Sequence, residues 1–193
     1  MVPRHEAIGD IIRESLLLTR SILEDSELIE TVAKVGEEMN RALHSGRKIL
    51  FFGNGGSAAD AQHMAAELVG RFSHERRALP ALALTTNSSS LTAIGNDYSF
   101  ERVFARQIEA FGSAGDVAVG ISTSGKSPNV IEGIRTAKQI GIVTAGMTGF
   151  QGGKLADKAD YCIRVPSEHT PRIQEAHILI GHILCKVIDD SFV

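Results

Sequence analysis

Two residues with spacing suited to chemistry, His63 and Glu67, stand four positions apart and therefore on one face of a predicted helix, one turn apart. Such a pair can chelate a divalent metal ion, and it can equally form an exposed ion pair. His182 lies in an apolar stretch, where a hydrogen-bonded core histidine is the ordinary explanation. Glu67 lies in an alanine-rich segment, and a buried carboxylate is costly without a partner. A shared site would explain why Glu67 and His182 both occur in apolar surroundings. There Glu67 would act as general base and His182 as general acid, with a metal polarising a carbonyl.

A second candidate site is the serine-rich segment Gly120 to Ser127, which matches the nucleotide-binding pattern G-x-x-x-x-G-K-S. Pro128 argues against a P-loop, because it disfavours helical geometry at Ser127, whereas a P-loop needs its Lys and Ser in the first helical turn. We therefore read Ser127 and Pro128 as the N-cap and first residue of a helix. A phosphate monoester site is predicted here, with a polar turn as the plainer alternative; its hydroxyls are those of Ser122, Thr123, Ser124 and Ser127.

The third candidate is the glycine-rich loop Gly53 to Ala58, which follows a predicted strand and opens a helix. It formally matches a relaxed dinucleotide fingerprint, but the next strand offers no acidic residue for a ribose, which argues against a dehydrogenase. The glycines leave backbone N–H groups free at the positive end of a helix. Ser57 and Asp60 are predicted to form a capping box, which gives Asp60 a structural role.

These loops and helices need a scaffold, and the apolar pattern predicts an α/β fold. Five strands are predicted, at 48–52, 81–84, 117–121, 142–147 and 161–165, with helices between them. This alternation predicts a three-layer sandwich with a five-stranded parallel sheet, with ligands at the carboxyl ends of the strands. One domain spanning 1–193 is expected. Residues 1–45 are predicted to form two N-terminal helices, the first with an apolar stripe suited to packing or oligomerisation.

Composition excludes several classes of protein. The formal net charge is −3 and no long Lys/Arg block occurs, so neither nucleic acid nor an anionic membrane surface is an expected partner. No apolar run approaches the ~20 residues of a membrane span, and the N-terminus lacks the pattern of an export signal, so a cytoplasmic location is expected. Cys162 and Cys185 show no disulfide or metal spacing and are predicted core residues.

Together the motifs resemble the sugar-isomerase (SIS) domain family and, within it, the phosphoheptose isomerases. The resemblance covers nearly the whole chain and rests on 53–63, 66–72, 95–97, 122–125 and 172–175. It implies a flavodoxin-like SIS domain. It also implies conversion of sedoheptulose 7-phosphate to D-glycero-D-manno-heptose 7-phosphate through an enediolate, in ADP-heptose precursor biosynthesis.

The resemblance also implies roles for individual residues. One zinc ion per subunit would be held by His63, Glu67, Gln174 and His182, with Glu67 as base and His182 as acid. The serine-rich segment would hold the phosphate, with Ser57 assisting. The sugar would meet Asn54, Gly55, Gly56, Glu67, Asn96, Asp97 and Gln174. Gln174 and His182 are eight residues apart, a rise of ~12 Å along a helix, so they reach one ion only by leaning together.

The family is expected to form homotetramers with sites between subunits. It also contains the main alternative, non-catalytic members that bind the bacterial replication initiator protein. That group is expected to lack the acidic residue at position 67 and the histidine at position 182, and both are present here.

Overall fold

The computed structural model describes residues 4–193, and its centre is a five-stranded sheet in which every neighbouring pair of strands is parallel. The strands follow the order β2-β1-β3-β4-β5. This confirms the predicted α/β fold, and the predicted strands agree to within about one residue at each end. The strands are β1 (Ile49–Gly53), β2 (Ala81–Ala83), β3 (Val117–Ile121), β4 (Val143–Thr148) and β5 (Tyr161–Arg164).

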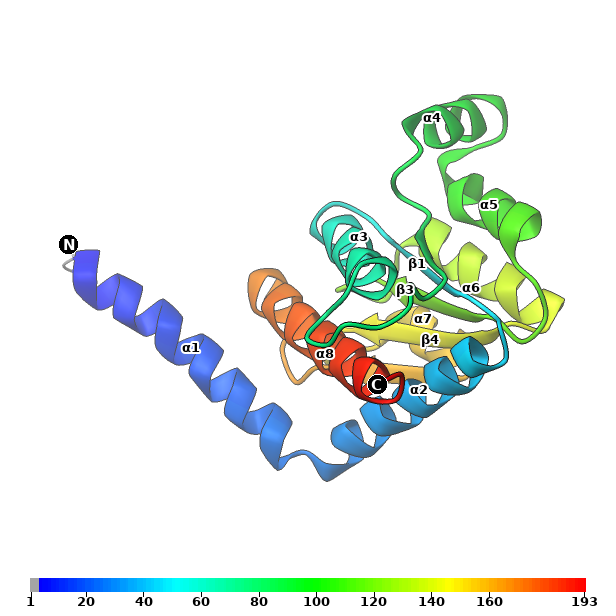
Figure 1. Cartoon of the computed structure of the whole chain (residues 1–193). Coiled ribbons are helices and arrows are strands. Elements are labelled where there is room, and N and C mark those ends of the chain that lie inside the picture. Colours follow the sequence, from blue (N-terminus) through cyan, green and yellow to red (C-terminus); the bar gives the residue numbers. More distant parts are fainter. Residues whose placement is uncertain (1–3) are drawn as a thin grey trace.

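The sheet is covered on both faces, which makes the fold a three-layer sandwich (Figure 1). Successive residues of β1 show why: Phe51 packs into one core and Phe52 into the other, and both are fully buried. One face carries α2 (Ser26–His44), α3 (Gly56–Val69) and α8 (Thr170–Asp190). The other carries α5 (Val103–Phe111), α6 (Pro128–Ile140) and α7 (Gly153–Lys158).

A short helical excursion leaves the sandwich beyond β2. It consists of α4 (Ser88–Asp97) and the 3₁₀ turn η1 (Phe100–Arg102), which lie beside α5 at the upper right of Figure 1. Asn87 caps α4, since its side chain accepts a hydrogen bond from the Ser90 amide. No residue of α4 is fully buried, but Leu91 and Ile94 pack partly buried against the core on the α5 and α6 face.

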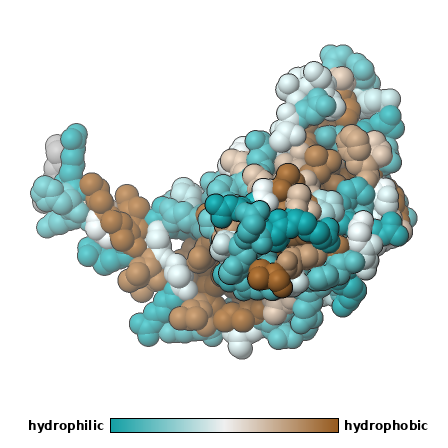
Figure 2. Space-filling model, viewed as in Figure 1, coloured by the Kyte–Doolittle hydropathy of each residue, from teal (hydrophilic) through white to brown (hydrophobic). Residues whose placement is uncertain are grey.

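The predicted N-terminal helices have different roles. α2 packs on the sheet through Val35, Met39 and Leu43, whereas α1 (Arg4–Glu24) projects from the body (Figure 1). Figure 2 shows apolar surface along this projecting helix. Its exposed apolar residues are Ile8, Ile11, Ile12, Leu16, Leu17 and Leu23. Among residues 4–193, no helix is both long and apolar enough to cross a membrane.

The strand order places two loops side by side. Strand β1 lies between β2 and β3, so the chain moves outward in opposite directions from β1 and β3, which form the switch point of the sheet. The glycine-rich loop follows β1 and the serine-rich segment follows β3. Both therefore lie at the carboxyl edge, where ligands collect in folds of this kind.

Candidate active site and metal centre

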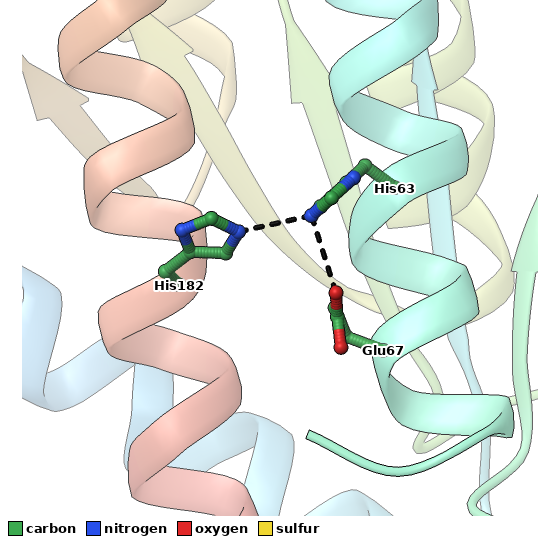
Figure 3. Close-up of side chains that lie close together, drawn as sticks. All are labelled: His63, Glu67 and His182. Carbon is green, nitrogen blue, oxygen red and sulfur yellow. Dashed lines mark hydrogen bonds and ion pairs between the residues drawn. The ribbon is translucent and has the colours of Figure 1, made fainter. Parts of the chain in front are cut away.

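Three of the predicted metal ligands converge between α3 and α8. His63 Nε2 lies 2.9 Å from His182 Nε2 and 3.2 Å from Glu67 Oε1, and one ligand atom of each residue falls within 4.8 Å of the others (Figure 3). The His63 side chain is 49% exposed and that of Glu67 is 24% exposed, so the cluster opens to solvent. Two imidazole nitrogens and a carboxylate oxygen at one point form a donor set typical of a catalytic zinc site with one open position.

The two helices can bring these side chains together because they run parallel to each other and pack closely. Gly181, next to His182, makes the approach possible, since a β-carbon there would lie 2.6 Å from Met64 Sδ. Phe72, just after α3, packs its ring 5.6 Å from the His182 ring. The spacing of His63 and Glu67 on one helix face is as predicted, and α8 supplies the third side chain.

Gln174, the fourth predicted ligand, lies near the other end of α3. A β-carbon on Gly56 would lie 2.3 Å from Gln174 Nε2, so the amide covers the first turn of that helix. Gln174 and His182 are two turns apart on α8. The structure thus brings together His63, Glu67 and His182, and it places Gln174 beside the glycine-rich loop.

The glycine-rich loop is shaped by close approaches. A β-carbon at Gly53 would lie 2.9 Å from both the Ile121 carbonyl oxygen and Ser57 Cβ, so only glycine fits against the end of β3. Gly55 has φ 56° and ψ −122° and stands just before α3. Gly55 and Gly56 are exposed, which leaves the start of the helix open to a ligand.

A reciprocal pair of amides joins the two loops. Asn54 Nδ2 donates to Asn129 Oδ1 at 2.9 Å, and Asn129 Nδ2 donates to Asn54 Oδ1 at 2.8 Å. Asn129 is buried, and its Oδ1 also accepts from the Val130 amide. The Asn54 side chain therefore holds the glycine-rich loop against the start of α6. This role in the fold is additional to the ligand contact predicted for Asn54.

The serine-rich segment leaves three of its four hydroxyl protons free to donate, because the bond between Ser122 and Ser127 uses only one of their two protons. Ser122 Oγ and Ser127 Oγ hydrogen-bond to each other at 2.8 Å. Ser124 Oγ accepts from the Lys126 amide, which leaves its own proton free, and no hydrogen bond to the Thr123 hydroxyl occurs among the described residues. A hollow of about 160 Å³ adjoins Thr123 and Ser124.

The local backbone also confirms that this segment is no P-loop. Helix α6 begins at Pro128 with Ser127 as its N-cap, so Lys126 and Ser127 stand outside the helix. Gly125 has φ 62° and packs against Gly152, whose carbonyl oxygen would lie 1.9 Å from a β-carbon at position 125. The segment is thus fixed from behind by the loop after β4.

Asn96 and Asp97 form the end of α4 and are exposed. Asn96 Nδ2 donates to Asp97 Oδ1 at 2.8 Å. Within the described part of the chain, no hydrogen bond joins either residue to the glycine-rich loop, and neither belongs to the His63 cluster.

Asp60 has a different position from the one predicted. The capping box is wrong, because α3 begins at Gly56, its N-cap is Gly55, and Ser57 is buried inside the first turn. Asp60 instead lies one turn before His63 on the same face, and its Oδ2 is buried without a hydrogen-bond partner among residues 4–193. Burial raises the pKa of the Asp60 carboxyl to about 6, and the charge of His63 opposes this shift.

Comparison with known proteins places this site in a family. The SIS domain family model matches residues 14–149. The phosphoheptose isomerase of Aneurinibacillus thermoaerophilus is 51% identical over 187 residues, covering 97% of this chain and 94% of that protein. The chain belongs to the phosphoheptose isomerases of the SIS domain family.

Two further phosphoheptose isomerases extend the similarity. Phosphoheptose isomerase 1 of Campylobacter jejuni is 55% identical over 174 residues, covering 90% of this chain and 94% of that protein. The solved phosphoheptose isomerase of Neisseria gonorrhoeae is 44% identical with a TM-score of 0.91, covering 97% of this chain and 100% of that chain. These matches confirm the resemblance and extend it through α8, which lies beyond the SIS match and carries His182.

In this member of the phosphoheptose isomerases, sequence reasoning missed Asn129. The only signal was an asparagine directly after the helix-opening proline, which is equally typical of an ordinary polar turn. Its partner, Asn54, stands 75 residues earlier, so the pairing depends on the strand order. The contact of Phe72 with His182 was missed for the same reason, since it joins distant parts of the chain.

Proposed function

We propose that this protein is a zinc-dependent aldose–ketose isomerase that converts sedoheptulose 7-phosphate to D-glycero-D-manno-heptose 7-phosphate. The observation that carries the proposal is the convergence of His63, Glu67 and His182 between α3 and α8. Relatives about half identical to this chain are named phosphoheptose isomerases, which supports a phosphorylated seven-carbon sugar as substrate.

The donor set fits zinc. Two histidines and one glutamate are a known combination in catalytic zinc sites, and one ion per subunit is proposed. Gln174, whose amide lies beside the glycine-rich loop, is proposed to bind the zinc ion from the side on which the substrate lies. When bound, zinc would supply a Lewis acid that polarises the sugar carbonyl and stabilises negative charge on its oxygen.

The proton transfers are assigned to Glu67 and His182. The Glu67 carboxylate removes a proton from C1 of the ketose, which leaves an enediolate over C1 and C2. The His182 imidazolium then delivers a proton to C2, and the hydroxyl proton on O1 moves to O2, which gives the aldose. Afterwards Glu67 is protonated and His182 is neutral, and solvent resets both because the cluster is partly exposed.

The phosphate is assigned to the serine-rich segment. Thr123 and Ser124 would donate directly, while Ser122 and Ser127 hold the segment's shape through their mutual hydrogen bond and face the same anion. Ser57, buried in the first turn of α3, is proposed to assist at the phosphate. The site thus binds the substrate at its unreactive end, and that binding orients C1 and C2.

The spacing of the two ends suits a long sugar. From Gly56 to His63 the rise of α3 is about 10 Å, and the serine-rich segment adjoins the first turn of that helix. An extended heptose 7-phosphate spans about 10 Å from phosphorus to C1. Between the ends, the proposed contacts with sugar hydroxyl groups are made by Asn54, Gly55, Gly56, Glu67, Asn96, Asp97 and Gln174.

The setting is part of the proposal as well. We place the reaction in the cytoplasm, in the synthesis of ADP-heptose precursors, and we propose a homotetramer whose sites lie between subunits. The exposed apolar residues of α1 support assembly with other copies of the chain.

The test is solvent deuterium incorporation into sedoheptulose 7-phosphate, followed by proton NMR. The protein is compared as purified, after chelator treatment and after zinc is restored. Exchange and aldose formation that stop with chelator and return with zinc are expected. Absence of exchange in all three samples would overturn the proposal and favour the non-catalytic binding role.

A further inference from the structure

The loop after α3 contains a buried arginine whose nitrogens are all engaged. The Arg76 side chain has no exposed surface. Its Nε donates to Asp189 Oδ1 at 2.9 Å and its Nη2 donates to the Glu67 carbonyl at 2.8 Å. Its Nη1 donates to the carbonyls of Leu68, Gly70 and Arg77. Arg76 therefore caps the carboxyl end of α3, where helix carbonyls would otherwise be unpaired.

The partner carboxylate is equally well held. Asp189 is fully buried near the end of α8, and its Oδ2 accepts from the amides of Ser73 and His74 at 2.9 and 2.8 Å and from Ser73 Oγ at 3.0 Å. Burial alone would raise the pKa of this carboxyl, but the hydrogen bonds from Ser73, His74 and Arg76 outweigh burial and lower it to about 2. Asp189 thus stays charged at neutral pH.

Both residues of this ion pair are connected to the elements that carry the His63 cluster. Arg76 binds the backbone of Glu67 itself, while Asp189 stands two turns after His182 on α8. The same loop contributes Phe72, whose ring packs against the imidazole of His182. The pair and its loop therefore set where α3 and α8 stand relative to each other at the cluster.

Stability alone is a weak reason for such a pair. Taking two charges out of water costs about as much as their attraction returns, and apolar replacements of buried ion pairs are often neutral. A pair that connects the two helices of a metal cluster can instead fix the distances between ligands.

We propose that Arg76 and Asp189 are positioning residues that hold Glu67 and His182 in register for metal binding and proton transfer. This inference rests on the proposed function. It assigns no contact with substrate to either residue, because both lie behind the cluster.

The experiment measures zinc affinity of the metal-free protein by calorimetry, together with kcat and KM, for Arg76→Lys, Asp189→Asn and Phe72→Leu. The matched control is Asp116→Asn, at a residue that stands directly before β3 and has no contact with the His63 cluster among the described residues. Asp116 is also fully buried, and it accepts from the backbone amides of Lys48 and Ser113 and pairs with Lys48 Nζ at 2.6 Å. Urea unfolding of every variant gives its loss of stability.

We expect zinc affinity and kcat to fall about 10- to 100-fold in Asp189→Asn, with KM changed less than about twofold. Zinc affinity and kcat should fall less in Arg76→Lys than in Asp189→Asn. Phe72→Leu should also lower zinc affinity. Asp116→Asn should lower the free energy of unfolding without changing zinc affinity or kcat. Equal zinc affinity in wild type and the Asp189 and Phe72 variants would overturn the inference, as would equal effects in the Asp116 control. Failure of the wild type to bind zinc would instead overturn the proposed function.

Discussion

At the scale of single residues, Glu67 has two assignments, as ligand and as base. A carboxylate that holds a metal is a weaker base, because the ion stabilises its charged form. His63 Nε2 lies 3.2 Å from Glu67 Oε1 and 2.9 Å from His182 Nε2, so in the proposed site His63 would hold the ion with either residue. Under the proposed function, the ligand and base roles of Glu67 would therefore alternate during turnover.

The substitution Glu67→Gln should abolish isomerisation, because an amide cannot accept the C1 proton. We expect kcat to fall at least about 10²-fold, with sugar phosphate still bound. Turnover is measured by NMR, binding by calorimetry, and zinc content by metal analysis. Glu75→Gln is the control, since Glu75 is 90% exposed in the nearby loop and should retain full activity. Retained activity in Glu67→Gln would eliminate its role as base.

The substitution Ser124→Ala should act on substrate binding. Loss of one hydrogen bond to a charged group costs about 1.5 kcal/mol, so KM should rise about tenfold with kcat nearly unchanged. Initial rates at varied substrate concentration separate the two constants. Ser89→Ala, in the exposed part of α4, is the matched control. An unchanged KM in Ser124→Ala would remove this hydroxyl from the phosphate site.

At the scale of elements, sequence predicted what depends on local pattern. The buried strands β1 and β3 show as apolar runs, and the spacing of His63 and Glu67 follows from helical periodicity alone. The start of α3 was predicted wrongly. A serine followed three residues later by an aspartate suggests a capping box, but the preceding glycines let the chain enter the helix one residue before Ser57.

Contacts between distant elements could not be predicted from the sequence. The approach of α8 to α3 at Gly181 and the amide pair of Asn54 and Asn129 depend on how helices settle on the sheet. Residue types and local spacing carry no information on which distant positions come into contact. Asp60 was explained by its neighbours in sequence, whereas the lack of a partner for its Oδ2 among residues 4–193 depends on burial in the folded chain.

The contact between α8 and β4 predicts a pH effect on stability. His177 is fully buried, and its Nε2 lies 3.2 Å from the Thr148 carbonyl oxygen. Burial lowers the pKa of His177 from 6.5 to about 4, with the hydrogen bond to Thr148 opposing. The unfolded chain therefore takes up this proton first, so the folded state loses stability as pH falls from 6.5 to about 4.

His177→Gln should remove that loss. Relative to the variant, the wild type should lose up to about 3 kcal/mol between pH 6.5 and 4, measured by urea unfolding with chelator present. The comparison with the variant is needed because the raised pKa of Asp60 acts with the opposite sign, favouring the folded state as pH falls through about 6. Parallel pH profiles for wild type and variant would contradict the assignment to His177.

At the scale of the whole molecule, α1 is the element that the rest of the chain explains least. Arg172 fastens it to α8, since Nη1 donates to the Ile11 carbonyl and to Ser15 Oγ, both at 2.8 Å. Beyond this attachment the helix exposes apolar residues, among them Leu16 at 68%. The proposed assembly with other copies would cover them.

Leu16→Glu should therefore weaken assembly. We expect the wild type to sediment as a tetramer and the variant as smaller species, with the unfolding temperature of the wild type alone rising with protein concentration. Arg13→Glu, an exposed charge on the same helix, is the control. A monomeric wild type would contradict the assembly, and an unchanged variant would place the interface elsewhere.

The conformation of Gly55 has a consequence for handedness. Its angles, φ 56° and ψ −122°, are the mirror image of an ordinary extended conformation, and nothing lies within 4 Å of an added β-carbon. The obstacle to a side chain at this position is therefore chirality alone. A D-alanine placed there by chemical ligation would keep the loop and its backbone N–H groups in place, whereas L-alanine would strain the entry to α3. Position 55 thus selects glycine because the genetic code offers no residue of the opposite hand.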